Sequence, residues 1–465
     1  MKFAFTAIAL LLSAPAAAAD LRPDQVAFRQ IYKELVETNT TYSSGSCTAA
    51  AEKVAARLRA AGYAESEIRL FEPPGHPREG GLVATLVGSD PRLKPMLLLA
   101  HIDVVEAKRA DWTRDPFTLI EEDGYFYGRG TVDDKPHAAI WTDTLIRLKA
   151  RKPPARTIRM ALTCGEEGGG TIVGAEWLAK EHKDWIDAEF ALNEGSSGAV
   201  DAAGKPISLA MQAGEKVFQD FRIEATNPGG HSSLPRPDNA LYDLAAALLR
   251  IGAYEFPVQF TDATRGYFAA RAKIDGGEMG AAMTRLLADP RDDAANAIVS
   301  RNPSLHSMLR TTCVATLANA GHANNALPQR ATANVNCRMF PGDPIDNVRA
   351  QLVKAIGNPA VTVTPVEPIS PTPPPPPLTD AIYRPALALA KTYYPGVPVL
   401  PTLLPGATDG RFLNAVGIPT YGVPGAMLGP TGDGMHGLNE RKSVAALYTE
   451  RDYLFDLVKV YAGVK

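Results

Sequence analysis

The sequence lacks several features that define common classes of protein. It has no excess of charge of one sign, because 48 Lys and Arg residues oppose 51 Asp and Glu residues and leave a net charge of −3. No basic block recurs along the chain, so we expect no nucleic-acid partner. Cysteine is scarce, with four in 465 residues, so the fold depends on a hydrophobic core rather than on a disulfide framework. The 45% apolar and 21% charged residues are typical of a globular protein, and the length allows two or three domains.

Long apolar segments are also missing, with one exception at the N-terminus. The apolar stretch Phe3–Leu12 follows a lysine and precedes small residues that end at Ala19. This is the pattern of a secretory signal peptide, and the stretch is shorter than the roughly 20 residues that a membrane-spanning helix needs. We therefore expect residues 1–19 to be removed as a signal peptide. The mature chain would begin at Asp20, would be periplasmic or secreted, and would have no membrane association.

An oxidising compartment permits disulfides, and two of the four cysteines have a suitable arrangement. Cys313 and Cys337 lie in strand-like segments that are separated by a turn. A bridge between these two residues and a pair of buried free thiols are both open at this point.

The first part of the chain alternates short apolar runs with helix-like stretches. We expect buried strands at Gly81–Val87, Met96–Ala100, Ile158–Thr163 and Phe190–Leu192, and helices at Gln25–Thr38, Ala49–Ala61, Ala138–Lys149 and Ile172–Lys180. Alternation of this kind predicts an α/β domain with a mostly parallel central sheet and helices on both faces.

The pattern changes near Gly214, where half-exposed strands and an amphipathic helix follow in the order of an α+β domain. The proline-rich segment 371–379 then forms a stiff linker, after which the helix and strand rhythm resumes. We therefore expect one α/β domain in two parts, residues 20–213 and 380–465. An inserted α+β domain of residues 214–370 interrupts it.

Histidines and carboxylates follow the expected strands at the points where these strands end. The segment His101-Ile-Asp103, the pair Glu166-Glu167 and Glu194 each come after an apolar run. Ligands bind outside the carboxyl ends of strands in open α/β sheets, so we expect these side chains to lie together. Considered separately, each motif has a plainer explanation, such as a solvated surface pair at 166 and 167.

Two further motifs complete the set. Asp133-Asp134 stands at the expected start of a helix, with Pro136 suited to its first turn, and His436 lies in a glycine-rich loop near the C-terminus. Capping of the helix is the plainer explanation for the two aspartates. Taken together, however, two histidines and several carboxylates at strand ends are the donors that borderline divalent metals such as Zn²⁺ favour.

The ordered motifs are similar to those of the M20 family of co-catalytic metallopeptidases. The matching segments are Ala100-His-Ile-Asp-Val-Val105, Tyr127-Gly-Arg-Gly130 with Asp133-Asp-Lys135, Gly229-Gly-His231-Ser-Ser233, Asn325-Ala-Leu-Pro328, Thr408-Asp-Gly-Arg411 and His436-Gly-Leu-Asn-Glu440. Residues 261–306, inside the insert, make the chain most similar to the carboxypeptidase S-like branch. That branch includes Gly-Xaa carboxypeptidases and secreted N-acyl amino acid hydrolases.

The resemblance implies two zinc ions per subunit, with Co²⁺ or Mn²⁺ as substitutes, and assigns roles by position. The implied ligands are His101, Asp133 and Glu194 for one ion, and Asp133, Glu167 and His436 for the other. The implied catalytic residues are Asp103, which orients His101, Glu166 as the general base and then the general acid, and His231, which polarises the scissile carbonyl. The implied substrate-carboxylate ligands are Asn325, Arg338, Thr408 and Arg411. Pro136 and His137 depart from the family pattern, which usually has glycine after Asp-Asp-Lys.

The expected reaction is hydrolysis of an amide bond next to a free C-terminal carboxylate, in a small peptide or an N-acyl amino acid. The alternatives are an aminopeptidase or dipeptidase of the same family, a single-metal enzyme, or a peptide-binding relative without turnover. Because His231 lies on the insert, it would reach the metals through closure of this lid or dimerisation domain, or from the partner subunit of a homodimer. Residues 261–306 could cover the surface on which two subunits would pair.

Overall fold

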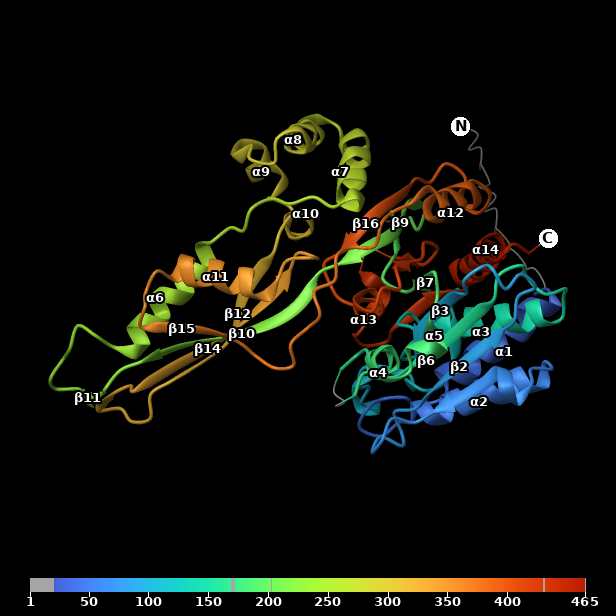
Figure 1. Ribbon diagram of the computed structural model, residues 1–465, viewed down its shortest axis with the longest axis horizontal. Helices are drawn as coiled ribbons and strands as arrows, with labels where there is room; N and C mark the ends of the chain where they lie inside the picture. Colours follow the sequence, from blue (N-terminus) through green and yellow to red (C-terminus); the bar gives the residue numbers. More distant parts are fainter. Residues whose placement is uncertain (1–20, 169–171, 202, 430, 465) are drawn as a thin grey trace, which may run out of the picture.

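The computed structural model describes residues 21–168, 172–201, 203–429 and 431–464 (Figure 1). The expected signal peptide, residues 1–19, lies outside the described residues. The molecule is elongated, with an α/β body at one end and the insert extending away from it (Figure 1). No helix in the described part of the chain is long and apolar enough to cross a membrane.

A large mixed sheet forms the centre of the α/β body. Its strands are β1 (Ile68–Phe71), β2 (Gly81–Leu86), β3 (Met96–His101), β6 (Ile158–Thr163), β7 (Phe190–Asn193), β8 (Gly198–Val200), β9 (Pro206–Glu215), β16 (Val399–Leu404), β17 (Thr420–Gly422) and β18 (Met427–Leu428). They lie in the order β1-β2-β6-β3-β7-β17-β9-β8-β18, and β16 pairs with β9. The central pairs β6–β3, β3–β7 and β7–β17 are parallel, whereas β1–β2 and β2–β6 are antiparallel.

Helices cover both faces of this sheet and bury its side chains in two separate clusters. One cluster includes side chains from α1 (Pro23–Val36), α2 (Cys47–Ala60), α3 (Lys135–Lys149), α12 (Asp380–Tyr393) and α14 (Val444–Ala462). The other includes α4 (Gly174–Glu181), α5 (Lys183–Ile186) and α13 (Gly410–Ala415). Successive residues of β3 alternate between them: Leu98 packs in the first cluster, and Leu97 and Leu99 pack in the second. Burial on both faces explains the continuous apolar run in the sequence, and the expected α/β fold is confirmed.

The insert contains a smaller antiparallel sheet. It consists of β10 (Val217–Thr226), β12 (Thr312–Ala320), β14 (Arg330–Met339) and β15 (Val361–Pro365), in the order β12-β14-β10-β15. Side chains of α6 (Ala240–Ala253) and α11 (Ile345–Ile356) pack with it in a core of their own. β10 alternates buried and exposed residues along its length, as expected for a strand with one covered face.

The described residues form two further, smaller sheets. One has β4 (Ile120–Glu122), β5 (Tyr125–Tyr127) and β19 (Arg441–Ser443), and the other pairs β11 (Gly230–His231) with β13 (Ala326–Leu327). The β11–β13 pair lies at the end of the insert that is farthest from the α/β body (Figure 1).

Residues 261–306 form helices that lie between the insert and the α/β body. These are α7 (Asp262–Asp275), α8 (Gly277–Ala288), α9 (Asp293–Val299) and α10, which ends at Met308 (Pro303–Met308). Their core includes Phe340 from the insert and Leu403 from β16 of the α/β body. They leave β12 largely exposed, so this segment does not cover the edge of the insert sheet.

The four cysteines form two disulfides, Cys313–Cys337 and Cys47–Cys164. The first bridge lies between β12 and β14, where the two cysteines are direct partners in the register, and it excludes the alternative of free thiols. The second joins segments 117 residues apart. Sequence spacing gave no indication of it, because its partners meet only when α2 packs against the sheet.

Candidate metal centre

Three neighbouring parallel strands deliver the first residues of the site to one edge of the large sheet. β3 lies between β6 and β7, and His101 at the end of β3 is in register with Thr163 at the end of β6. The residues that follow these strands, including Glu166, Glu167 and Glu194, therefore emerge side by side. This is the arrangement that the strand-end motifs predict.

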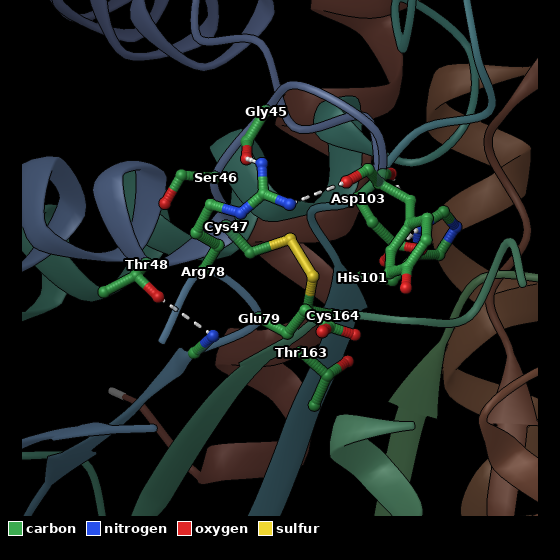
Figure 2. Close-up of a disulfide and its surroundings, with 12 residues drawn as sticks. Gly45, Ser46, Cys47, Thr48, Arg78, Glu79, His101, Asp103, Thr163 and Cys164 are labelled. Atoms are coloured by element: carbon green, nitrogen blue, oxygen red, sulfur yellow. Dashed lines mark hydrogen bonds and ion pairs between the residues drawn. A yellow bond between two sulfur atoms is a disulfide. The ribbon is translucent and has the colours of Figure 1, made fainter. Parts of the chain in front are cut away.

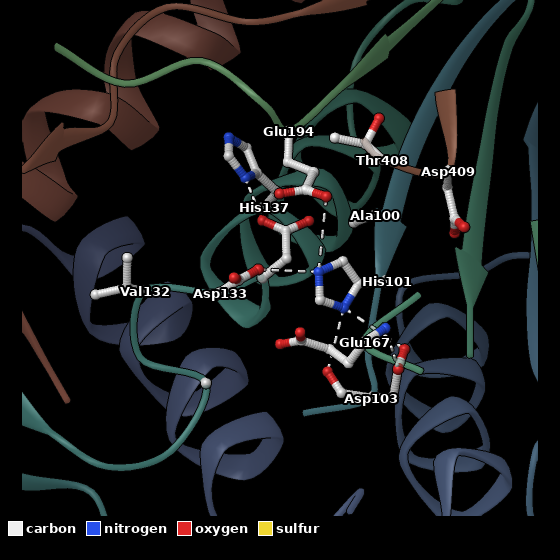
Figure 3. Close-up of polar contacts among 12 residues, drawn as sticks. Ala100, His101, Asp103, Val132, Asp133, His137, Glu167, Glu194, Thr408 and Asp409 are labelled. Atoms are coloured by element: carbon white, nitrogen blue, oxygen red, sulfur yellow. Dashed lines mark hydrogen bonds and ion pairs between the residues drawn. The ribbon is translucent and has the colours of Figure 1, made fainter. Parts of the chain in front are cut away.

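The imidazole of His101 is buried among carboxylates (Figure 3). Its Nε2 lies 3.0 Å from Oδ1 of Asp133 and 3.8 Å from Oε1 of Glu194. Its Nδ1 lies 3.2 Å from the backbone carbonyl oxygen of Asp103 and 3.5 Å from Oδ1 of that residue. Asp103 therefore contacts Nδ1, the ring nitrogen on the side opposite to Asp133 and Glu194. In this position it can fix the orientation and tautomer of the ring.

The second oxygen of Asp133 faces the other histidine. Oδ2 of Asp133 lies 3.1 Å from Nε2 of His436, and this nitrogen lies 2.9 Å from Oε2 of Glu167. Asp133 thus stands between His101 and His436, with one oxygen directed to each. Donor atoms of His101, Asp133 and Glu167 lie within 4.8 Å of one another, as do those of His101, Glu166 and Glu194.

A buried carboxylate joins the two loops that carry Asp133 and His436. Oε1 of Glu440 accepts hydrogen bonds from the backbone amides of Val132 and Asp133, and Oε2 accepts one from Arg129 at 2.6 Å. His436 has a φ of +58°, which a residue with a side chain seldom adopts and which the surrounding contacts must hold. Glu440 thereby fixes the spacing between the shared carboxylate and the second imidazole.

The site concentrates negative charge in a poorly solvated region. Burial raises the pKa of Glu194 well above its ordinary value, and the nearby charge of Asp133 raises it further. Burial likewise raises the pKa of Glu166 well above the ordinary range, with contributions from Asp409 and Glu167. A cluster of carboxylates at this distance is stable in its ionised form only with a compensating positive charge. Divalent cations supply this charge, so the donor set fits a metal centre.

The histidines compensate part of this charge in the protein alone. Hydrogen bonds that the imidazole of His436 donates to the carboxylates of Asp133 and Glu167 raise the pKa of His436 to about 10. Burial opposes protonation of His101, but Asp103 and Asp133 reverse the effect and raise its pKa. A metal ion would take the place of these protons, since a histidine ligand must be neutral at the coordinating nitrogen.

The second aspartate of the pair has a different environment. The side chain of Asp134 does not cap α3, so the capping explanation fails for this residue. It is hydrogen-bonded through Oδ1 to Nδ1 of the buried His137, and Nε2 of His137 lies 3.5 Å from Oε1 of Glu450. The departure from the family pattern at 137 therefore supplies a buried partner for Asp134.

Three of the four expected carboxylate-binding residues lie near the junction between the insert and the α/β body. Thr408 accepts a hydrogen bond from Asn193, the residue before Glu194, at 3.1 Å. The guanidinium of Arg338, on β14, lies 5.0 Å from the ring centre of Phe218. Burial lowers the pKa of Arg338, and the positive charge of Arg411 lowers it further.

The structure does not bring His231 or Asn325 to the carboxylate cluster. His231 lies on β11 at the far end of the insert (Figure 1) and is exposed. Its Nδ1 accepts hydrogen bonds from the backbone amide and the hydroxyl of Ser233. The backbone carbonyl of Asn325 accepts a hydrogen bond from Ser232, so Asn325 belongs with His231 and not with Arg338.

Two buried acids near the site were not predicted from the sequence. Asp409 accepts a hydrogen bond from Thr163 at 2.8 Å, and burial raises its pKa to about 6. Glu215 accepts a hydrogen bond from the amide of Thr408 at 2.6 Å. Asp409 lies inside the motif Thr408-Asp-Gly-Arg411, so its position in this motif could have indicated a place near the site. No sequence pattern distinguishes Glu215 from other acidic residues.

A family model described as "Peptidase family M20/M25/M40" matches residues 97–460. The chain belongs to this family. The match includes every strand end and loop that supplies the carboxylate cluster, and it extends through the insert. The protein is accordingly a hydrolase that acts on peptide or amide bonds.

Relatives and solved structures are consistent with this assignment. The chain is 29% identical over 385 residues to the human "N-fatty-acyl-amino acid synthase/hydrolase PM20D1", covering 81% of this chain and 76% of that protein. It is 28% identical to "Carboxypeptidase S" from Saccharomyces cerevisiae over 275 residues, which is 56% of this chain and 48% of that protein. The fold matches an M20 family metallo-carboxypeptidase, Sso-CP2 from Sulfolobus solfataricus, with a TM-score of 0.66 at 16% identity, over 95% of this chain and 100% of that one.

A second solved structure is the YXEP protein of Bacillus subtilis, described as "a Dinuclear Metal Binding Peptidase from M20 Family". Its TM-score is 0.59 at 15% identity, and the match covers 95% of this chain and 99% of that one.

Proposed function

We propose that this protein is an exported, zinc-dependent hydrolase that cleaves the amide bond next to a free C-terminal carboxylate. Its substrates would be small peptides, as for a carboxypeptidase, or N-acyl amino acids. The observation that carries the proposal is the position of Asp133, whose two carboxylate oxygens lie 3.0 and 3.1 Å from Nε2 of His101 and Nε2 of His436.

The donors divide into two sets that share Asp133. His101 and Glu194 would complete one metal site, and Glu167 and His436 would complete the other. Nitrogen and carboxylate oxygen donors suit Zn²⁺, and Co²⁺ or Mn²⁺ could substitute. Bound divalent metals supply Lewis-acid chemistry, because they polarise a carbonyl group and lower the pKa of water to about 7. The description of the YXEP protein as a dinuclear metal-binding peptidase supports the same stoichiometry here.

Glu166 is our choice for the group that moves the proton. Its carboxylate has an oxygen within 4.8 Å of donor atoms of His101 and Glu194, and the resemblance to the family places it in neither ligand set. Burial raises its pKa, which suits a carboxylate that takes a proton from an attacking water and returns it to the departing amine. Asp103 orients His101 and, through Oδ2, accepts a hydrogen bond from the backbone amide of Glu167 at 3.0 Å.

Arg411 and Arg338 would bind the free carboxylate of the substrate, with Thr408 beside them. Burial and the positive charge of Arg411 both lower the pKa of Arg338, and a bound carboxylate would offset both effects. The names of the relatives, carboxypeptidase S and an N-fatty-acyl-amino acid hydrolase, support a substrate with this terminus.

A matched panel of substrates tests this proposal. It contains N-acyl amino acids, N-blocked dipeptides, dipeptides with a free amine, and the C-amidated form of each, with and without chelator. We expect hydrolysis of the N-acyl amino acids and N-blocked dipeptides, with loss of activity on C-amidation and on chelation. Activity that requires a free amine and tolerates C-amidation would instead indicate an aminopeptidase. Binding without hydrolysis across the panel would indicate a peptide-binding relative.

We further propose that His231 acts in a homodimer, on the metal centre of the partner subunit. β12 is the outer strand at one edge of the insert sheet. Apolar side chains are exposed on this strand and on α6, including Leu317 (71% exposed) and Leu249 (76%). An uncovered strand edge with exposed apolar residues is suited to pairing with a second copy. His231 and Asn325 would then reach the scissile carbonyl of the partner together, and closure of the insert within one chain is the alternative.

Complementation distinguishes these two routes. The variants His231→Ala and Glu166→Gln each remove one essential group, and each should be nearly inactive alone. If His231 acts across the dimer, mixing and re-annealing the two variants creates dimers with one intact site and restores part of the activity. If His231 acts within its own chain, the mixture stays as inactive as its components.

Export rests on the expected signal peptide at residues 1–19. Expression of the full chain with its native N-terminus should place the protein outside the cytoplasm. N-terminal sequencing of the exported form should begin at Asp20.

A further inference from the structure

The loop that carries Glu166 and Glu167 begins at a disulfide. Cys164 follows β6 directly and stands two residues before Glu166, and its sulfur is bonded to that of Cys47 at the start of α2. Both cysteines are almost completely buried, with 5% and 2% of their surfaces exposed. Figure 2 shows that the bridge lies in the same region as His101 and Asp103.

Glycines flank the two glutamates in this loop. Gly165 has a φ of +95° and Gly168 a φ of +76°, which are backbone conformations that glycine adopts readily and other residues seldom do. Two contacts close to these glycines restrain the loop. The amide of Gly174 donates to the carbonyl of Cys164 at 2.7 Å, and the amide of Glu167 donates to Asp103.

The other end of the bridge is held firmly. The amide of Cys47 donates to the carbonyl of Arg78 at 2.8 Å, and the guanidinium of Arg78 donates to the carbonyls of Tyr42 and Gly45. Ser46 caps the first turn of α2. The bridge therefore connects the start of the loop that carries Glu166 and Glu167 to the start of α2 (Figure 2).

We propose that the Cys47–Cys164 disulfide is a positioning element that fixes Glu166 and Glu167 relative to His101 and Asp133. The inference rests on the proposed function, in which these residues carry the base and the metal ligands. Supports of this kind hold reacting groups within about 0.5 Å of a productive position. Their loss typically lowers metal affinity or activity about 10- to 100-fold.

The protein contains its own matched control. The Cys313–Cys337 disulfide lies within the insert sheet, between β12 and β14. The experiment compares the double variants C47A/C164A and C313A/C337A with the wild-type protein at 25 °C. Circular dichroism establishes that each is folded. Substitution is preferable to reduction, because reduction would create a new metal site. The sulfur atoms of Cys47 and Cys164 and a carboxylate oxygen of Asp103 lie within 4.8 Å of one another, so free thiols at 47 and 164 would bind added metal.

We expect C47A/C164A to show a kcat about 10- to 100-fold lower and an affinity about 10-fold weaker for one of the two metal ions, with KM changed less than about threefold. C313A/C337A should keep kcat and both metal affinities within about twofold of wild type, because a general loss of stability does not misplace the loop. Equal effects of the two substitutions, or an unchanged kcat in C47A/C164A, would overturn the inference.

A second measurement applies if C47A/C164A does not fold. Wild-type protein is reduced in steps, and the freed thiols are alkylated before zinc is added so that they cannot bind the metal. Peptide mapping then determines which bridge is open at each step. Activity should fall with opening of Cys47–Cys164 and be independent of Cys313–Cys337, and the opposite correlation would contradict the proposal. Suppose that the wild-type protein hydrolyses its substrate and binds two metal ions, but that neither the substitution C47A/C164A nor opening of this bridge lowers its activity. That result refutes this inference alone. A wild-type protein that neither hydrolyses the substrates nor binds two metal ions refutes the proposed function and the inference together.

Discussion

Glu215 lies where the α/β body joins the insert, and its burial makes a quantitative prediction about stability. The side chain ends β9 and is 4% exposed. Its Oε2 accepts a hydrogen bond from Thr408, and its Oε1 has no hydrogen-bond partner among the described residues. Burial raises the pKa of Glu215 from 4.5 to about 7, against the opposing effect of Thr408.

The sign of the pH dependence follows from this raised pKa. The folded protein holds the proton of Glu215 more tightly than the unfolded chain does, so the contribution to stability is fully present below pH 4.5. It is lost progressively as the pH rises from 4.5 to about 7. This interval corresponds to about 3 kcal/mol in the free energy of unfolding.

The variant Glu215→Gln isolates this contribution. Glutamine keeps a carbonyl oxygen for the amide of Thr408 but cannot ionise. Its free energy of unfolding relative to wild type should therefore increase by about 2–3 kcal/mol between pH 5 and pH 8. Lys216, whose pKa burial lowers to about 7, changes stability in the opposite direction at higher pH, but it is present in both proteins and cancels.

Urea unfolding of both proteins at pH 5, 6, 7 and 8, with metal in constant excess, measures the difference. A difference that stays constant within about 0.5 kcal/mol across this range would refute the assignment of a buried, protonated carboxyl at 215.

Three further predictions concern the reaction and the assembly. Glu166→Gln should lower kcat by about 10²- to 10⁴-fold with unchanged metal content, and hydrolysis at the parent rate would exclude Glu166 as the base. Arg411→Lys should raise KM about tenfold or more for substrates with a free carboxylate, because lysine cannot form two parallel hydrogen bonds to it, whereas an unchanged KM would place the carboxylate elsewhere. Leu317→Asp should convert a dimer to a monomer in analytical ultracentrifugation and lower activity in parallel, while a monomeric and fully active variant would contradict the role of the partner subunit.

The local sequence pattern was sufficient for most of the α/β body. Apolar runs such as Met96–Ala100 are continuous because both faces of the strand are buried, and this signal does not depend on distant residues. For the same reason, the histidines and carboxylates that follow the strands could be expected to meet at one edge of the sheet.

Features that depend on packing between distant segments were not predictable. The Cys47–Cys164 bridge requires α2 to lie against the end of β6, and no spacing rule encodes that contact. The support of Asp133 by Glu440 and the pairing of Asp134 with His137 are likewise products of tertiary packing. The resemblance grouped Asn325 with Arg338 as ligands of the substrate carboxylate. In the structure the two residues lie apart, with Asn325 beside Ser232 and His231. Sequence order does not report which end of an extended insert a residue occupies.

The central claim is that two divalent cations are held side by side by a shared carboxylate at 133. The most direct test is the metal content per chain of protein purified without chelator and dialysed against limiting zinc. We predict two zinc ions in the wild-type protein, one in His436→Ala, and fewer than one in Asp133→Ala, because Asp133 belongs to both ligand sets. A wild-type content of one ion, or an Asp133→Ala variant that keeps two, would contradict the account.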